Sequence, residues 1–509
     1  MLARVRSEAL SGLEGHAVEV EVDVATAAPA FTIVGLPDVA VQESRERVRS
    51  AIVNSGFRFP SRRITVNLAP ADLRKEGPSF DLPIALAFLA ATGQAAWPEH
   101  APAALGELAL DGTLRPVTGA LAVAESLGRR GVRALLLPAA NAREAALVQG
   151  LQVIGAGTLE EAARAMADGA PVVAHPLSAE ELLGVRAAYT ADMADVQGQA
   201  HAKRALEVAA AGAHAVLMVG PPGSGKTMLA RRLPSIMPPL SVDEAVAITR
   251  VYSVAGLLPA DQPLVVARPF RAPHHTISSS GLVGGGSSPR PGEVSLAHLG
   301  VLFLDEFPEF RLAALEGLRQ PLEDGEVTIS RALTSVTFPA RIMLVAAMNP
   351  CPCGFLGDRE RECTCAEHRI RQYTSKLSGP LLDRIDLRIE VARVSRLARR
   401  QSAPREEPSA AIAARTAAAR RRQLERLCQS GRYANAHMTP RQVRQLCRLR
   451  PDAADMLDQA YERLRLSARA CDRIVKVAQT IADLEGTPHI HAAHVAESLS
   501  YRLRPPGLP

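Results

Sequence analysis

The fold of this chain is decided by the stretch Val216-Leu217-Met218-Val219-Gly220-Pro221-Pro222-Gly223-Ser224-Gly225-Lys226-Thr227. An apolar run typical of a buried strand ends at Gly220, and a helical pattern begins at Lys226. This is the motif G-x-x-x-x-G-K-T with a strand before it and a helix after it, the context that a phosphate-binding loop (P-loop) requires. Glycines let backbone N–H groups approach phosphate oxygens, and the helix N-terminus adds a partial positive charge. We therefore predict that a nucleoside triphosphate is bound by Gly220, Pro221, Pro222, Gly223, Ser224, Gly225, Lys226 and Thr227.

The residues that handle metal and water are predicted at the ends of two segments. Lys226 is expected to reach the β- and γ-phosphates, and the Thr227 hydroxyl is expected to bind Mg²⁺. A second apolar run, residues 301–304, ends in Asp305 and Glu306. Ligands of doubly wound parallel sheets bind at the carboxyl ends of the strands. We expect Asp305 to hold Mg²⁺ through water and Glu306 to polarise the attacking water, which together predicts ATP hydrolysis.

Further motifs resemble those of AAA+ ATPases. The apolar run 342–348 ends at Asn349, which resembles the AAA+ sensor that positions the lytic water. Residues 195–199 resemble the segment that flanks the adenine. Leu381-Leu382-Asp383-Arg384 resembles the arginine-finger motif of the magnesium-chelatase and MCM branches, which implies that Arg384 acts on the γ-phosphate of a neighbouring subunit. That resemblance implies a homo-oligomer, expected to be a hexamer; the alternative for Arg384 is a surface ion pair with Asp386.

Two insertions identify the branch. Residues 268–276 with 281–292, and residues 307–310 with 315–325, resemble loop insertions of magnesium-chelatase ATPase subunits. The likeness is greater still to ComM (YifB) magnesium-chelatase-like proteins and covers the whole chain. It implies a ring-shaped DNA motor, a helicase that drives branch migration of branched or single-stranded DNA intermediates during natural transformation. The alternative is an ATP-dependent protein-remodelling or metal-insertion chaperone of the magnesium-chelatase type. For His274 and His275 we favour a loop role over metal binding.

Residues 1–175 predict an α/β domain. Alternating strands are predicted at 18–22 and 64–68, a helix at 38–52, and a buried strand at 135–137. Gly77-Pro78-Ser79 before an apolar helix, and residues 112–119, resemble Lon proteases. The dyad lysine is absent, because Leu121 stands at its place and Lys75 is the only lysine before Lys203. We therefore interpret Ser79 as a helix N-cap and predict a Lon-like domain without proteolysis.

Four cysteines crowd into one loop, at Cys351, Cys353, Cys363 and Cys365. Four thiolates suit a tetrahedral structural Zn²⁺, and a metal would order a loop that lacks its own core. The alternatives are free thiols and a redox role. The odd total of seven cysteines indicates a reducing compartment.

The C-terminal part is basic and helical. Residues 391–450 contain fifteen Arg and three Glu and no Lys or Asp, a net +12 within a chain of net +6. This pattern predicts a polyanionic partner or a solvated helical face. Thr439-Pro440 predicts a helix start. Residues 467–473 resemble the second sensor of this branch, which implies that Arg469, or alternatively Arg473, contacts the γ-phosphate.

The expected architecture is therefore α/β with three parts. A linker at 176–190 follows the Lon-like domain, the AAA+ core with its parallel sheet spans 191–390 and contains the four-cysteine loop (residues 351–365), and residues 391–509 form a basic connection and a helical lid. No signal peptide and no apolar run of membrane-spanning length is evident, so we expect a cytoplasmic protein without a membrane partner.

Overall fold

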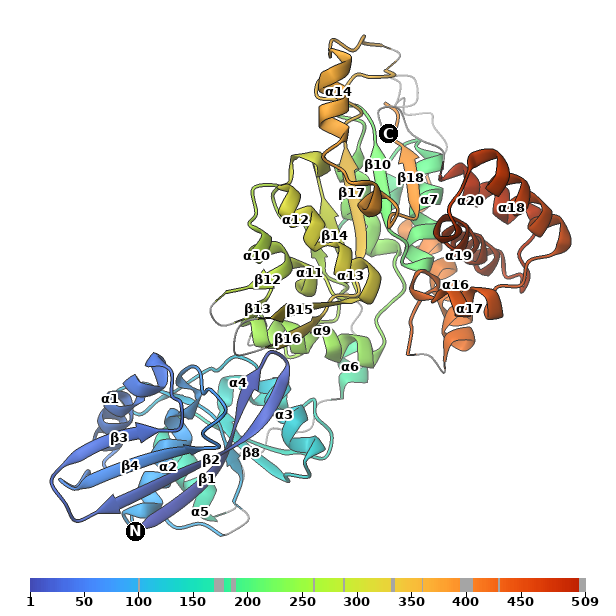
Figure 1. Cartoon of the computed structure of the whole chain (residues 1–509). Helices are drawn as coiled ribbons and strands as arrows, with labels where there is room; N and C mark the ends of the chain where they lie inside the picture. The colour runs from blue at the N-terminus through green and yellow to red at the C-terminus, as the bar shows by residue number, and fades with distance from the viewer. Residues whose placement is uncertain are drawn as a thin grey trace. The chain divides into compact units, whose positions relative to one another are not determined.

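The chain forms two compact units, which are interleaved in sequence. A computed structural model describes residues 1–98, 101–168, 178–184, 189–259, 261–286, 289–330, 335–358, 360–393, 406–428 and 431–502. The first unit comprises residues 1–186 and 242–266, and the second comprises residues 187–241 and 267–509. Figure 1 shows both units and labels many of their helices and strands.

The first unit is built on a four-stranded sheet in the order β1-β2-β4-β3. Strands β1, β2 and β4 are antiparallel, and β3 runs parallel to β4. One side of the sheet carries Val18, Val20, Val22 and Val24 into the core, because side chains alternate along a strand. The strands are β1 (Leu2–Ser11), β2 (Glu14–Ala25), β3 (Ala30–Val34) and β4 (Arg63–Ala69).

Helices and a smaller parallel sheet complete this unit. The smaller sheet has the order β5-β8-β9, and β6 pairs with β7. The apolar helix α2 (Asp81–Ala91) is almost entirely buried. The strands predicted at 18–22, 64–68 and 135–137 and the helix at 38–52 are confirmed. The remaining elements are α1 (Val39–Asn54), β5 (Ala103–Ala104), β6 (Glu107–Leu108), β7 (Leu114–Arg115), α3 (Ala120–Arg129), β8 (Ala134–Pro138), α4 (Ala139–Ala145), β9 (Gln152–Ala156), α5 (Leu159–Asp168) and α6 (Ala179–Gly184).

A helix from the middle of the chain belongs to the first unit. The sequence placed residues 242–266 in the ATPase core, but helix α9 (Val242–Ala255) packs in the N-terminal unit. Arg250 of α9 forms an ion pair of 3.0 Å with Glu125 of α3. The Gly119 amide donates to the Ser253 carbonyl at 3.0 Å. The N-terminal unit is therefore discontinuous in sequence. Of the predicted linker 176–190, residues 179–184 form α6, and residues 176, 177 and 185–188 lie outside the described residues.

Ser79 is not a helix N-cap, so that prediction is wrong. It lies inside a 3-10 helix, Pro78–Phe80, whose N-cap is Gly77, and α2 begins only at Asp81. The fixed φ of Pro78 starts a tight turn ahead of the α-helix. Lys75 is buried, and its Nζ donates to the Pro70 carbonyl.

The second unit is organised around a five-stranded parallel sheet in the order β11-β14-β17-β10-β18. Alternate side chains enter two different hydrophobic cores: Val216 and Met218 of β10 lie on one face, and Leu217 and Val219 on the other. The predicted parallel sheet is confirmed. The strands are β10 (Val216–Val219), β11 (Phe270–Arg271), β14 (Val301–Leu304), β17 (Met343–Met348) and β18 (Leu387–Glu390).

Helices and two hairpins surround this sheet. The hairpins are β12 (Gly284–Gly285) with β13 (Arg290–Pro291), and β15 (Glu326–Ser330) with β16 (Ser335–Pro339). The helices are α7 (Ala200–Gly212), α8 (Lys226–Arg232), α10 (Ser279–Val283), α11 (Glu293–Leu296), α12 (Leu312–Gly317), α13 (Arg319–Asp324), α14 (Glu367–Thr374) and α15 (Gly379–Leu382).

The C-terminal helices form the predicted helical lid. Thr439 caps the helix that begins at Pro440 through a capping box with Gln442, which confirms the predicted start. Among the helices of the described residues, none is long and apolar enough to cross a membrane. The lid helices are α16 (Ser409–Leu427), α17 (Pro440–Leu446), α18 (Pro451–Leu464), α19 (Ala468–Glu485) and α20 (Ala492–Ser500).

The basic C-terminal segment directs several arginines inward. Arg420 donates to the carbonyls of Ala210 and Ala211 in α7, and Arg422 donates to the Asp483 carbonyl at 2.8 Å. Arg415 pairs with Glu207, and Arg426 pairs with the buried Asp483 carboxylate. These groups hold α16 against α7 and α19. Arg420 is buried and therefore not available to a polyanion, whereas Arg421, Arg422, Arg441, Arg444, Arg448 and Arg450 are exposed. An arginine-rich surface therefore remains on this segment, and a polyanionic partner stays a prediction. Residues 394–405 of the basic connection lie outside the described residues.

Candidate nucleotide site

The predicted P-loop joins the carboxyl end of β10 to the N-terminus of α8. Gly223 and Gly225 have φ of 75° and 95°, a left-handed conformation that favours glycine. Lys226, the first residue of α8, folds back over the loop. Its Nζ donates to the carbonyls of Gly220 at 2.6 Å and Pro221 at 3.0 Å. The loop therefore holds the lysine ammonium at the carboxyl end of the sheet, where phosphate is expected.

The Lys226 ammonium is largely removed from water. Burial lowers the pKa of Lys226 to about 8, although the Asp305 carboxylate acts in the opposite direction. A phosphate would replace the carbonyl partners of Nζ with a full negative charge. Such a partner favours the protonated lysine and raises its pKa again.

Thr227 and Asp305 lie together, as the sequence predicted. The Thr227 hydroxyl donates to Asp305 Oδ2 at 2.8 Å, and Asp305 Oδ1 accepts from the Glu306 amide at 2.9 Å. A hydroxyl next to a carboxylate is an all-oxygen donor set of the kind that Mg²⁺ uses beside a nucleotide phosphate. These two residues therefore fit the predicted magnesium site.

Glu306 follows β14 in a left-handed conformation, with φ of 53°, which is uncommon for a residue with a side chain. Its side chain is 58% exposed, and its Oε2 lies 3.0 Å from Nδ1 of His275. The two histidine rings of His274 and His275 are 4.1 Å apart. For His275 only a loop role was expected from the sequence. Its contact with Glu306 could be found only from the fold, because the two residues are far apart in the chain.

Asn349 meets the P-loop lysine. It follows β17, which pairs with β10, and its Oδ1 accepts from Lys226 Nζ at 3.2 Å. The backbone at this point also continues the sheet, because the Gly220 amide donates to the Met348 carbonyl at 3.2 Å. Lys226, Thr227, Asp305 and Asn349 are thus brought together at one end of three neighbouring strands.

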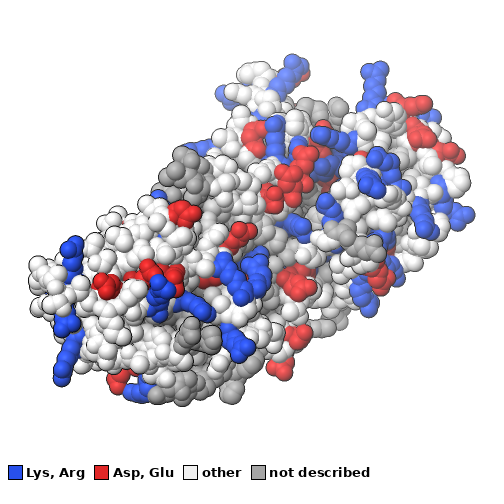
Figure 2. Space-filling model, turned by 60° about the horizontal axis from the view of Figure 1, so that its bottom comes forward, with Lys and Arg blue, Asp and Glu red and all other residues white. Residues whose placement is uncertain are grey.

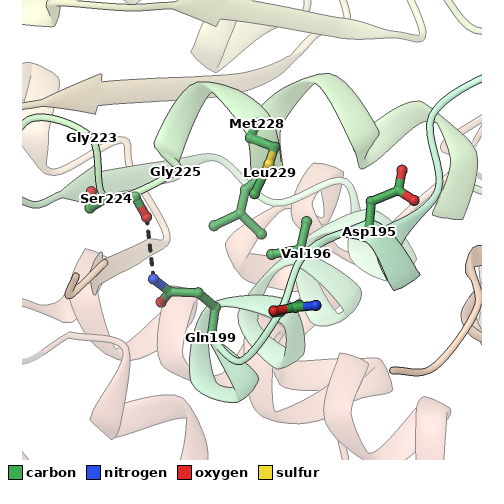
Figure 3. A pocket seen from close by; sticks show the side chains of 9 residues that line it. Asp195, Val196, Gln199, Gly223, Ser224, Gly225, Met228 and Leu229 are labelled. Carbon is green, nitrogen blue, oxygen red and sulfur yellow. Dashed lines mark hydrogen bonds between the residues drawn. The ribbon is translucent and has the colours of Figure 1, made fainter. Parts of the chain in front are cut away.

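A cavity of about 500 Å³ opens beside the P-loop. Figure 3 shows it between the loop and the segment that begins at Asp195. Gln199 Nε2 donates to the Ser224 carbonyl at 3.2 Å and to the Ala392 carbonyl at 2.6 Å, which ties that segment to the loop. Apolar side chains of Val196, Met228 and Leu229 line the cavity. The cavity suits a planar base next to bound phosphates, at the segment that the resemblance assigned to adenine.

Arg384 lies at the opposite end of the sheet. It precedes β18, which runs parallel to β10, and the amides of Asp386 and Leu387 donate to the Ala215 carbonyl ahead of β10. The P-loop follows β10. Arg384 therefore lies by the amino ends of the strands and is not brought to the P-loop of its own chain. Its guanidinium pairs with Glu323 instead of Asp386, which excludes the surface pair that the sequence left open.

The two second-sensor alternatives differ in this structure. Arg473 donates to the Arg384 carbonyl at 2.8 Å and to Asp386 Oδ1 at 2.6 Å. Although burial raises the pKa of Asp386, Arg473 and His214 hold it well below its usual range. Arg469, in the first turn of α19, is exposed. Arg473 is thus held beside Arg384, whereas the Arg469 side chain is exposed to solvent.

The four loop cysteines converge. Their Sγ atoms all lie within 4.8 Å of one another. Cys351 Sγ is 3.3 Å from Cys353 Sγ, and Cys363 Sγ is 3.6 Å from each of them. Four sulfurs bound to one Zn²⁺ at ~2.3 Å stand about 3.8 Å apart, so the cluster fits a tetrahedral zinc. Burial raises the pKa of Cys353, but amides of Phe355 and Thr364 outweigh this and lower it to about 6.

Comparisons with known proteins point to one family in three regions that cover most of the chain. Family profiles described as "Subunit ChlI of Mg-chelatase", "Magnesium chelatase, subunit ChlI" and "Magnesium chelatase, subunit ChlI C-terminal" match residues 20–141, 192–398 and 406–502. The chain is 44% identical to the uncharacterized protein YifB of Salmonella typhimurium, over 98% of this chain and 97% of that protein. It is 44% identical to an uncharacterized protein of Mycobacterium tuberculosis, over 98% of each. It is also 43% identical to competence protein ComM of Haemophilus influenzae, over 98% of this chain and 97% of ComM. The chain therefore belongs to the magnesium chelatase ChlI-like AAA+ family, together with the ComM and YifB proteins.

Proposed function

We propose that the chain hydrolyses ATP in a ring of identical subunits, in which each site is completed by an arginine of the next copy. The observation that carries this proposal is the separation of the two sets of charged groups. Lys226, Thr227 and Asp305 lie at the carboxyl end of the sheet, and Arg384 lies at its amino end. A rigid strand separates them, so one chain cannot bring both sets to one phosphate. Two copies arranged head to tail can, and such contacts form a ring when the rotation between successive copies closes.

In the proposed reaction the residues of one chain bind and orient the nucleotide. Lys226 leaves the P-loop carbonyls for the phosphates, Thr227 and Asp305 would hold Mg²⁺, and the base occupies the cavity beside Gln199. Bound Mg²⁺ supplies positive charge to the phosphate oxygens. Glu306, released from His275, orients and polarises the attacking water. Arg384 of a neighbouring copy then stabilises charge in the transition state, an effect of roughly 10³–10⁵ in rate.

Mixing two inactive variants tests the shared site. Glu306→Gln disables the P-loop side and keeps the arginine, whereas Arg384→Ala does the reverse. Each variant alone is expected to be inactive. In an equimolar mixture about a quarter of the interfaces should join an intact P-loop side to an intact arginine, so activity should return in part. Absence of recovery, with co-assembly verified by labelled subunits, would refute the shared site.

We infer further that the ring, expected to be a hexamer, acts on DNA as a branch-migration motor. Support comes from the name of the Haemophilus influenzae relative, a competence protein, and from exposed arginines in and just after the four-cysteine loop, Arg361, Arg369 and Arg371. Arg359 of the same loop lies outside the described residues. Figure 2 shows basic and acidic side chains interspersed on the face that it draws. We expect the exposed arginines of the loops to contact DNA phosphates.

The test is ATP turnover with branched, single-stranded and duplex DNA across a salt series. Branched or single-stranded DNA should raise turnover, and the effect should weaken steeply with salt because phosphate contacts release counterions. Glu substitution of Arg369 and Arg371 should reduce the stimulation and leave turnover without DNA intact. If no DNA stimulates turnover at low salt while a protein partner does, the remodelling chaperone is the better description.

A further inference from the structure

The four-cysteine loop packs directly on the P-loop. It begins two residues after Asn349, which contacts Lys226, and its first turn approaches Pro222 of the P-loop. We propose that a zinc ion held by Cys351, Cys353, Cys363 and Cys365 braces the P-loop, so that nucleotide affinity depends on zinc occupancy. This inference rests on nucleotide binding as proposed above and goes beyond it, because it assigns a structural metal control over that site.

The contact between the loops is made at Gly354. Its φ is +86°, and a Cβ built on it would stand 2.5 Å from Cδ of Pro222 and 3.8 Å from Cγ of Asn349. Glycine is therefore required both by the left-handed backbone and by the close approach. Pro222 lies in the P-loop itself. Gly354 thus fills the space between the P-loop and the sensor Asn349, one residue after the ligand Cys353.

A second contact follows one residue later. The Phe355 ring packs against two guanidinium groups, Arg361 at 4.2 Å and Arg393 at 5.4 Å from the ring centre. Arg393 also donates to the Pro222 carbonyl at 3.4 Å. It lies 3.6 Å from Asp358 and 3.7 Å from Glu360, both within the four-cysteine loop. Arg393 therefore links the loop to the same P-loop proline that Gly354 touches.

The cysteines are the cross-link that fixes this arrangement. In sequence, Cys351 and Cys353 precede residues 354–362, and Cys363 and Cys365 follow them. Between them the loop offers two large apolar side chains, Phe355 and Leu356, too few for a core of its own. Metal binding then supplies the ordering free energy of such a loop. Without the metal, the turn at Gly354 is no longer held in place, and the P-loop loses its packing contact at Pro222.

Two variants separate the metal from the contact. Cys363→Ser removes one of the four ligands and leaves Gly354 unchanged. Gly354→Ala keeps all four cysteines but introduces a Cβ against Pro222. The matched controls are Cys428→Ser, an exposed cysteine outside the cluster, and Gly431→Ala, a glycine of φ +61° with nothing within 4 Å of its Cβ position. Each full-length protein is assayed for zinc by elemental analysis and for affinity toward a fluorescent ATP analogue. Circular dichroism and thermal melting check the fold.

The wild type should carry one zinc per chain. Cys363→Ser should lose zinc and bind the analogue at least about tenfold more weakly, because displacement of a binding loop by about 1 Å costs that much or more. Gly354→Ala should keep zinc and still bind several-fold more weakly, and both controls should match the wild type. Removing zinc with a mercurial and a chelator should reproduce the Cys363→Ser affinity, and adding zinc back should restore it.

Three results would overturn the inference: wild-type protein free of zinc, analogue affinity unchanged by zinc removal, or Gly354→Ala with wild-type affinity. A wild type that holds zinc but binds no nucleotide would instead refute the proposed ATPase function.

Discussion

Each unit contains a lysine whose side chain is almost fully buried, Lys75 in the first and Lys226 in the second, and the two differ in what surrounds them. Lys75 is 0% exposed and Lys226 is 8% exposed, and burial lowers the pKa of both. Lys75 donates to one backbone carbonyl, that of Pro70. Lys226 lies among glycines, next to a Thr–Asp pair and an asparagine, at the rim of an open cavity. A lowered lysine pKa thus reports burial alone, whereas function requires neighbours that can handle phosphate, metal and water.

The largest effect expected from this comparison is that of Lys226→Ala. ATP turnover should fall by about 10²–10³-fold or more, because the transferred phosphate loses a positioned cation. Turnover measured with the malachite green phosphate assay checks this. Wild-type turnover in a correctly folded Lys226→Ala protein would contradict the functional difference between the two buried lysines.

The next effect is on the pH dependence of nucleotide binding. With a pKa of about 8 in the free protein, Lys226 loses its proton above that pH, and binding of the phosphates must take the proton up again. The Kd for ATP should therefore rise above pH 8, by up to about tenfold per pH unit. Fluorescence titration between pH 7 and 10 measures it. The Lys226→Ala profile should be flat in this window, and a flat wild-type profile would contradict the burial of this ammonium.

Lys75→Met should leave ATP turnover unchanged. It should change the free energy of unfolding by no more than about 1–3 kcal/mol, because two effects oppose each other: an apolar side chain of similar length replaces a buried cation, and the Pro70 carbonyl loses its donor. The folded-state pKa of Lys75 lies below its usual 10.5, so the unfolded chain binds more protons between these two values. Stability of the wild-type N-terminal unit should therefore rise as pH increases through this interval, and Lys75→Met should lack the rise. Denaturant unfolding as a function of pH provides the measurement. Loss of ATP turnover in a folded Lys75→Met protein would mean that the two lysines are not as different as their surroundings indicate.

The smallest effect is expected for Ser79→Ala. Ser79 lies in a 3-10 turn. Its backbone carbonyl, not its hydroxyl, accepts a hydrogen bond from the Gly106 amide at 2.8 Å. The melting temperature should shift by about 1–3 °C or less, as for a surface substitution. Protease activity that disappears in Ser79→Ala would instead establish a nucleophile there.

Local motifs explain why much of the nucleotide site could be predicted. The P-loop, Asp305 and Asn349 each follow an apolar run that ends at the same edge of a parallel sheet, so their meeting follows from strand direction. Partners distant in sequence could not be predicted. Arg415 and Arg426 are neutralised by Glu207 and Asp483, which no local pattern connects to them. The contact of His275 with Glu306, and that of Gly354 with Pro222, likewise depend on how loops fold over the sheet.

Helix α9 was misassigned for a related reason. Its amphipathic pattern requires an apolar partner surface but does not say which domain provides it. Its position between the P-loop helix and β11 favoured the ATPase core, yet its buried Ile248 and Val251 belong to the N-terminal unit.

The interleaving of the two units has a practical consequence. The polypeptide passes between them three times, near residues 186, 241 and 266. A protein truncated after residue 186 would lack α9 and would expose the apolar surface that this helix covers, so it should aggregate. Removal of the first 186 residues would leave α9 as a loop insertion in the ATPase unit, without the N-terminal surface that it packs against. Separate expression of the ATPase unit therefore requires a shortened connection in place of residues 242–266, and separate expression of the N-terminal unit requires that residues 242–266 be joined to residues 1–186.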